Sequence, residues 1–159
     1  SGVEAIAGLS KDRDRALSAM LSTRYASSPD GKHLCAANVN VPVVSFASVS
    51  GDMLRESKRL QAQFDGEKES HGRTAKSYFN GVIADSKCVY ILYSGHRITD
   101  REMPSHECSH ILVYDWQGNI RHHYFLSRPV CSISLTDDGF YAVSTWPSGK
   151  LLHFVTDEV

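Results

Sequence analysis

The chain has 159 residues, a formal net charge of −1 and a hydrophobic content of 42%, values that suit one ordinary globular domain. This charge excludes a basic nucleic-acid footprint, and no apolar run approaches the ~20 residues of a membrane-spanning helix. We therefore expect no nucleic-acid partner and no membrane span. Residues 1–20 lack the pattern of a signal peptide, which leaves a cytosolic chain or a mature chain without its leader.

The first 21 residues predict a lead-in segment. Ser10 can cap a helix, and Ala16, Leu17, Met20 and Leu21 recur at helical spacing. This pattern is typical of a short packing helix, and an irregular lead-in is the alternative.

From residue 22 onward, one kind of hairpin occurs three times, over residues 25–38, 82–94 and 132–145. Each consists of an apolar strand, a turn at Asp-Gly or Asp-Ser, and a second apolar strand. The turn aspartates Asp30, Asp85 and Asp138 are 55 and 53 residues apart. A period of about 54 residues is close to the longer propeller repeats.

A second kind of hairpin follows the first. In residues 110–126, HILVYDWQGNIRHHYFL, Gln117-Gly118-Asn119 supplies the turn, because Gly and Asn tolerate positive φ. Both faces of its first strand are apolar, which predicts burial on both sides. Residues 43–60 align with this unit without a gap, and a truncated copy starts at Lys150.

Four hairpin-joined strands per period describe one blade of a β-propeller. The sequence therefore predicts an all-β fold in a single propeller-type domain over residues 1–159. We expect one blade at 22–64, a second at 78–127 and an incomplete blade at 130–159. A β-sandwich of short strands is the alternative.

The stretch from YFNGVIADSKCVYILYSG through HILVYDWQGNIRHHYFL to residue 155 resembles the C-terminal blades of a Bacteroides-type TolB-like six-bladed β-propeller family. The turn at residues 28–32, SPDGK, is similar as well. The other shared positions are Tyr90, Leu92, Tyr93, Ser94, Gly95, Val113, Asp115, Trp116, Gly118, Asn119, Tyr124, Leu126, Cys131 and Tyr141. The resemblance implies a six-bladed ring and a cell-envelope location, periplasmic or lipid-anchored. It carries no catalytic motif.

The family is about twice as long as this chain, which corresponds to its second half. Three blades do not close a ring, and an open arc exposes apolar faces and an unpaired edge. The expected partner is therefore a second copy of the chain or a missing N-terminal half. The segment before Ala16, GVEAIAGL, is apolar enough to supply the missing outer strand.

Two long connections, residues 64–78 and 95–110, are expected on one face of the propeller, opposite the short turns. We place any binding site on that loop-bearing face. Arginines there suit an anion and Trp146 suits stacking on a sugar, while a mixed, solvated surface is the alternative. The candidate ligand-binding residues are His71, Arg73, His96, Arg97, Arg101, Arg128 and Trp146.

A weak metal candidate lies in the same loop. In an extended segment His106, Cys108 and His110 point the same way, and His96 offers a fourth ligand of a type that zinc or copper accepts. The spacing matches no recognised metal motif, and a polar loop that runs into a strand is the favoured interpretation. The other cysteines lie in apolar runs, so no disulfide framework is expected.

The chain has no G-x-S-x-G, H-E-x-x-H, P-loop or G-x-G-x-x-G motif. We therefore predict no catalytic residues and no cofactor, and interpret the protein as a non-catalytic scaffold that binds a ligand or a protein. Two alternatives remain open. One is a hydrolase or lyase that acts on sugar or peptide at the loop-bearing mouth, and the other is a structural half with no separate activity.

Overall fold

The computed structural model describes residues 22–50, 53–61, 76–97, 104 and 106–156. The predicted lead-in at residues 1–21 lies outside this part. Within it the chain forms eleven strands and no helix, so no described helix is long and apolar enough to cross a membrane. The prediction of an all-β fold is confirmed.

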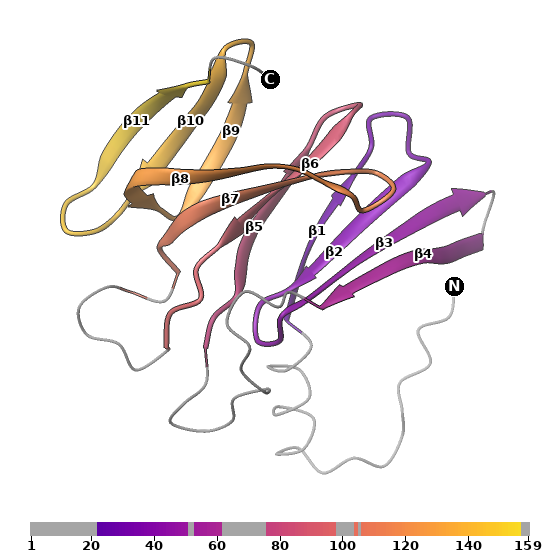
Figure 1. Cartoon of the computed structure of the whole chain (residues 1–159). Helices are drawn as coiled ribbons and strands as arrows, with labels where there is room; N and C mark the ends of the chain where they lie inside the picture. The colour runs from indigo at the N-terminus through magenta and orange to yellow at the C-terminus, as the bar shows by residue number, and fades with distance from the viewer. Residues whose placement is uncertain (1–21, 51–52, 62–75, 98–103, 105, 157–159) are drawn as a thin grey trace.

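The strands form three open antiparallel sheets, and in each sheet the strands lie side by side in chain order (Figure 1). The first sheet contains β1 (Thr23–Ser27), β2 (His33–Asn38), β3 (Val43–Ser50) and β4 (Met53–Gln61). The second contains β5 (Phe79–Ala84), β6 (Cys88–Tyr93), β7 (Cys108–Asp115) and β8 (Ile120–Val130). The third contains β9 (Ser132–Thr136), β10 (Gly139–Ser144) and β11 (Lys150–Val155). The strands fall within the predicted ranges 22–64, 78–127 and 130–159, except that β8 runs on to Val130.

Aspartates shape the turn between the first two strands of a sheet. The Asp30 carboxylate accepts the backbone N–H of Lys32 at 3.1 Å, and the Asp85 carboxylate accepts that of Lys87 at 2.6 Å. Such a side chain replaces a backbone acceptor and closes the turn locally. Gly31, at φ 71°, completes the first of these turns.

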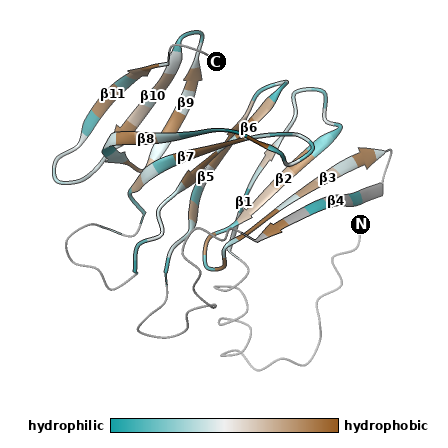
Figure 2. Ribbon diagram, in the orientation of Figure 1, coloured by the Kyte–Doolittle hydropathy of each residue, from teal (hydrophilic) through white to brown (hydrophobic). Residues whose placement is uncertain are grey.

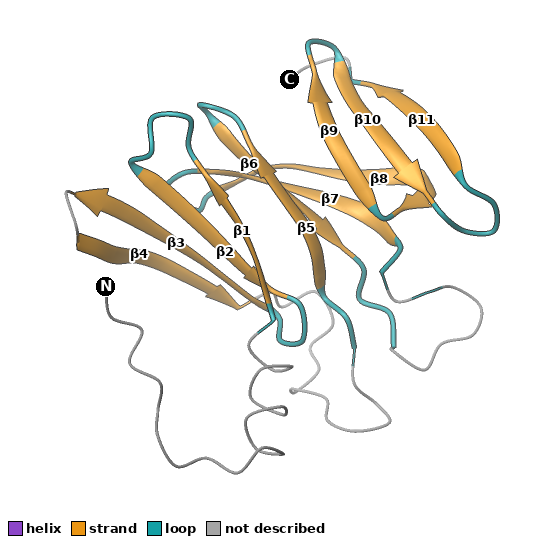
Figure 3. Cartoon of the chain, turned by 180° about the vertical axis from the view of Figure 1, so that it is seen from behind, coloured by secondary structure: helices purple, strands orange, loops and turns teal. Residues whose placement is uncertain are grey.

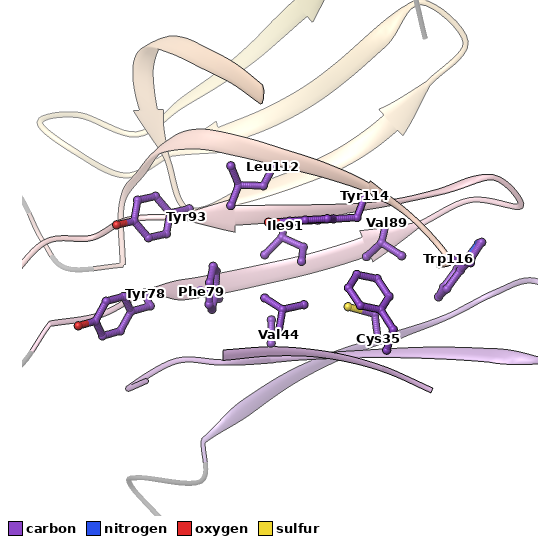
Figure 4. Packing of buried hydrophobic residues seen from close by; sticks show 12 residues of the cluster. Cys35, Val44, Tyr78, Phe79, Val89, Ile91, Tyr93, Leu112, Tyr114 and Trp116 are labelled. Carbon is purple, nitrogen blue, oxygen red and sulfur yellow. The ribbon is translucent and has the colours of Figure 1, made fainter. Parts of the chain in front are cut away.

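The second sheet is covered on both faces. One hydrophobic core lies between the first and second sheets and includes Phe46, Ile91 and Leu112 (Figure 4). The other lies between the second and third sheets and includes Leu92 and Phe140. Residues 111–116 are all buried, which confirms the prediction that this strand is buried on both sides. Figure 2 shows hydrophobic residues along the strands of this middle sheet.

The first strands of the three sheets are neighbours, since β1 contacts β5 and β5 contacts β9. The later strands of each sheet extend outward from this line (Figures 1 and 3). We call this arrangement of three sheets the fan, with the first and third sheets at its two ends.

The gap-free alignment of residues 43–60 with 110–126 does not hold beyond the turn. Phe46 pairs with Lys58, twelve residues later, whereas Val113 pairs with His122, nine residues later. β3 and β4 are separated only by residues 51–52, while residues 116–119 separate β7 from β8. Both hairpins contain a bulge, and a bulge changes the pairing without a clear sequence signal.

Gly118 supports the packing of the first two sheets. Its φ is 73°, and an added Cβ would lie 2.9 Å from Phe46 Cδ2 and from Lys58 Cδ. We expect Gly118→Ala to lower the free energy of unfolding by about 2–3 kcal/mol, measured by urea denaturation. Gly31→Ala is the matched control, because its φ is +71° but no atom lies within 4 Å of the added Cβ. Equal losses in the two variants would contradict a packing role for Gly118.

Candidate functional site

The connections of the sheets differ between their two ends (Figure 3). The turns that join first to second strands are short and lie at one end. The described residues that connect second and third strands, including 94–97, 106–107 and 145–149, lie at the other. This second end is the loop-bearing end, where the sequence places the candidate site.

The candidate ligand-binding residues are spread over several elements there. His96 and the exposed Arg97 follow β6, and Arg97 forms an isolated β-bridge with Lys76. Arg128 is exposed near the end of β8, and Trp146, 38% exposed, lies between β10 and β11. No hydrogen bond or ion pair joins any two of these four within the described part of the chain.

His71, Arg73 and Arg101 lie outside the described residues, so their predicted role stays a prediction.

The three weak metal candidates do not point the same way, so that expectation is wrong. Cys108 is fully buried in the second core, whereas His110 packs edge-on against Tyr93 of the first. A β-bulge between Cys108 and His110 places their side chains on opposite faces of the sheet. His106 is exposed and turns to Thr145, with 3.2 Å between Nε2 and Oγ1. Among the described residues, no three His, Cys, Asp or Glu side chains are arranged to hold a metal ion.

Cys108 is also not the polar-loop cysteine that the sequence indicates. Burial raises its pKa to about 12, so its thiol keeps its proton at neutral pH. All four cysteines are free thiols.

Glu107 is a residue that sequence reasoning missed. Its side chain is fully buried, and Oε1 accepts the Thr145 backbone N–H at 2.7 Å and also the Thr145 hydroxyl. The contact links the start of the second sheet's third strand to the third sheet. The run SHECSH gives no sign that Glu107 is buried, because its partner Thr145 lies 38 residues later in the chain.

A pocket of about 370 Å³ lies at the opposite end of the second sheet, beside the short turns. This pocket therefore does not lie on the loop-bearing face, where the sequence predicts a binding site. Tyr90, Val113 and Tyr124 form its apolar part, and the lining is completed by Lys87, Cys88, Asp115, Gln117, Arg121 and His122. Burial raises the pKa of Tyr90, and the hydrogen bond that its hydroxyl donates to Asp85 at 2.9 Å raises it further.

Asp115 organises one wall of this pocket. Its carboxylate accepts the backbone N–H groups of Gln117 at 3.0 Å and Asn119 at 2.8 Å and pairs with Arg121 at 2.7 Å. Burial raises the pKa of Asp115, but these hydrogen bonds and the guanidinium outweigh it, so the pKa lies below its usual value. The carboxylate thus fixes the β7–β8 turn at the rim.

No model of a known protein family matches the chain, and no curated protein matches it. The similarity to the TolB-like family therefore stays a prediction that depends on the quoted residues.

Removing the Glu107 side chain should loosen the contact between the second and third sheets. We expect Glu107→Ala to lower the free energy of unfolding by about 2–4 kcal/mol, because the partly buried Thr145 N–H loses its acceptor. Glu107→Gln keeps Oε1 and serves as the control, with a smaller loss in the same denaturation assay. If Ala and Gln lower the stability equally, the acceptor role of Oε1 is excluded.

Asp115 should make stability depend on acid pH. Because its folded pKa is lowered, the stabilisation is present above the unfolded pKa of about 3.9 and is lost as the pH falls through the folded pKa. We expect Asp115→Asn to lower the free energy of unfolding by about 1–2 kcal/mol at pH 7 and to flatten its decline below pH 4. Asp137→Asn, at an exposed aspartate, is the control. Identical pH profiles for Asp115→Asn and the parent protein would refute this role.

Proposed function

We propose that this chain is half of a six-bladed β-propeller, which a second copy completes, and that the ring is a non-catalytic scaffold for binding a ligand or a protein. The observation that carries the proposal is the pair of open sheet faces at the two ends of the fan. The resemblance to the TolB-like family supports the blade number.

The arrangement of the sheets supports blades over a sandwich. In a β-sandwich each sheet packs through one face, with the other face solvated. Here the second sheet packs through both faces, and β1, β5 and β9 are neighbours along one line. A radial array of four-stranded antiparallel sheets has this pattern.

The outer face of the third sheet is apolar and exposed. Tyr141 is 47%, Val143 41% and Leu151 72% exposed, and Val143 pairs with Leu151 across β10 and β11. At the other end of the fan, Tyr25 on the outer face of the first sheet is 63% exposed. Exposed apolar clusters of this kind mark association surfaces. Two copies arranged with two-fold symmetry would place the third sheet of each against the first sheet of the other.

The loop-bearing end supports a scaffold over an enzyme. Two of its polar side chains are held by one residue, since Glu107 Oε1 and His106 Nε2 both contact Thr145. Trp146 stands partly exposed beside them and offers an aromatic surface. A hydrolase or lyase acting at this end is the alternative, and a structural half with no separate activity is the third possibility.

The mass in solution, measured by light scattering after size exclusion, tests ring closure. We expect a mass near twice 17.6 kDa for the chain. Leu151→Glu should shift the mass to that of one copy, because the charge would be buried in the contact. Ile120→Glu is the matched control, since Ile120 is 53% exposed on β8, away from both open faces, and this variant should stay dimeric.

A stable, cooperatively unfolding monomer at all concentrations would contradict closure by a second copy. Equal behaviour of the two glutamate variants would show that the third sheet's outer face is not the contact.

A further inference from the structure

Two histidines of neighbouring strands meet on one face of the second sheet. His110 on β7 pairs with Phe125 of β8, and His123 on β8 pairs with Leu112 of β7, so the two histidines are diagonal neighbours. His110 Nδ1 lies 2.9 Å from His123 Nε2. His110 therefore has a histidine partner on the adjacent strand, in place of the loop residues that the sequence groups with it.

Aromatic rings restrict the orientation of both imidazoles. Phe125 packs edge-on against His110, with ring centroids 4.5 Å apart, and its ring centroid lies 4.8 Å from that of His123. The buried Tyr93 also packs edge-on against His110, at 5.5 Å. Such contacts limit side-chain rotation, so less conformational entropy is lost when the two rings bind an ion together.

The distance between the two ring nitrogens is close to that of a metal site. In the hydrogen bond one ring donates its N–H to the lone pair of the other, so the two nitrogens already point toward each other. Two nitrogens bound to a tetrahedral Zn²⁺ at about 2.0–2.1 Å lie about 3.3 Å apart. The two rings therefore need to separate by only about 0.4 Å to admit an ion between them.

We propose that His110 and His123 bind one divalent transition-metal ion of the kind that prefers imidazole, with Zn²⁺ as the reference ion. His123 is exposed and His110 is half-buried, so an ion can reach the pair from solvent. On binding, the shared proton moves to the far nitrogen of its own ring, and each imidazole gives one lone pair to the ion.

The remaining positions around the ion are open. Among the described residues no third His, Cys, Asp or Glu side chain joins the pair, so water completes the coordination. A metal ion with open positions can exchange water for a donor group of another molecule, such as a carboxylate or an imidazole. The site would then contribute directly to binding by the scaffold.

Isothermal titration calorimetry of the whole chain with ZnCl₂ tests the site. We expect one ion per chain with a dissociation constant of roughly 10–100 μM, because only two protein ligands contribute. His110→Gln and His123→Gln should each weaken binding by roughly tenfold or more, since one imidazole alone remains. MgCl₂ should give no heat, because Mg²⁺ prefers oxygen ligands.

His122→Gln is the matched control. His122 precedes His123 in the chain and is also exposed, but it stacks on Tyr124, whose ring packs against the second core. This variant should bind Zn²⁺ as the parent protein does. Absence of heat at about 1 mM ZnCl₂, or equal affinity of all three glutamine variants, would overturn the proposal.

Nitrogen-15 NMR of the imidazoles locates the ion in the unaltered protein, with signals assigned from the glutamine variants. Of the eight histidines, Zn²⁺ should shift the Nδ1 signal of His110 and the Nε2 signal of His123 and leave His106 and His122 unchanged. Shifts confined to other histidines would also overturn the proposal. Because both ligands lie on one sheet of one chain, this outcome is independent of the solution mass that tests ring closure.

Discussion

The burial of the second sheet on both faces is the constraint on which the rest of the structure depends. A sheet with one solvated face can alternate apolar and polar residues, but residues 111–116 must be compatible with two cores at once. The apolar run in β7 therefore demands a neighbouring sheet on each side. Phe46 of the first sheet and Phe140 of the third sheet belong to the two cores that cover it. The first and third sheets each have a second face that belongs to neither core.

This constraint explains which parts of the fold were predictable. Apolar runs interrupted by Asp and Gly specify hairpins locally, because turn residues act through their own side chains and dihedral angles. Asp30 and Asp85 use the same carboxylate-to-backbone contact, and both turns were placed correctly from the sequence. Burial on both faces was readable for the same reason, since it leaves an unbroken apolar stretch.

The details of the site were not predictable, because they arise between segments distant in the chain. The bulge that separates Cys108 from His110 depends on how β8 pairs with β7. In the sequence Glu107 resembles an ordinary loop residue, because its hydrogen-bond partner Thr145 is distant in the chain and follows a strand of another sheet. The pocket likewise combines side chains of β6, β7, β8 and their turns, which no single motif encodes, and it lies at the end whose turns are shortest.

The two contacts between sheets are completed by different residues, although the three sheets have the same strand order. At the end of the first contact the Trp116 indole stacks on His33, with ring centroids 5.7 Å apart. In the second contact the Phe140 ring, which comes from β10, packs edge-on against both Tyr90 and Tyr124. Because a protein interior is closely packed, each contact must be filled by side chains that fit its own surfaces. The repeated turns therefore specify the strands, while the packing between the sheets depends on residues that the repeat does not share.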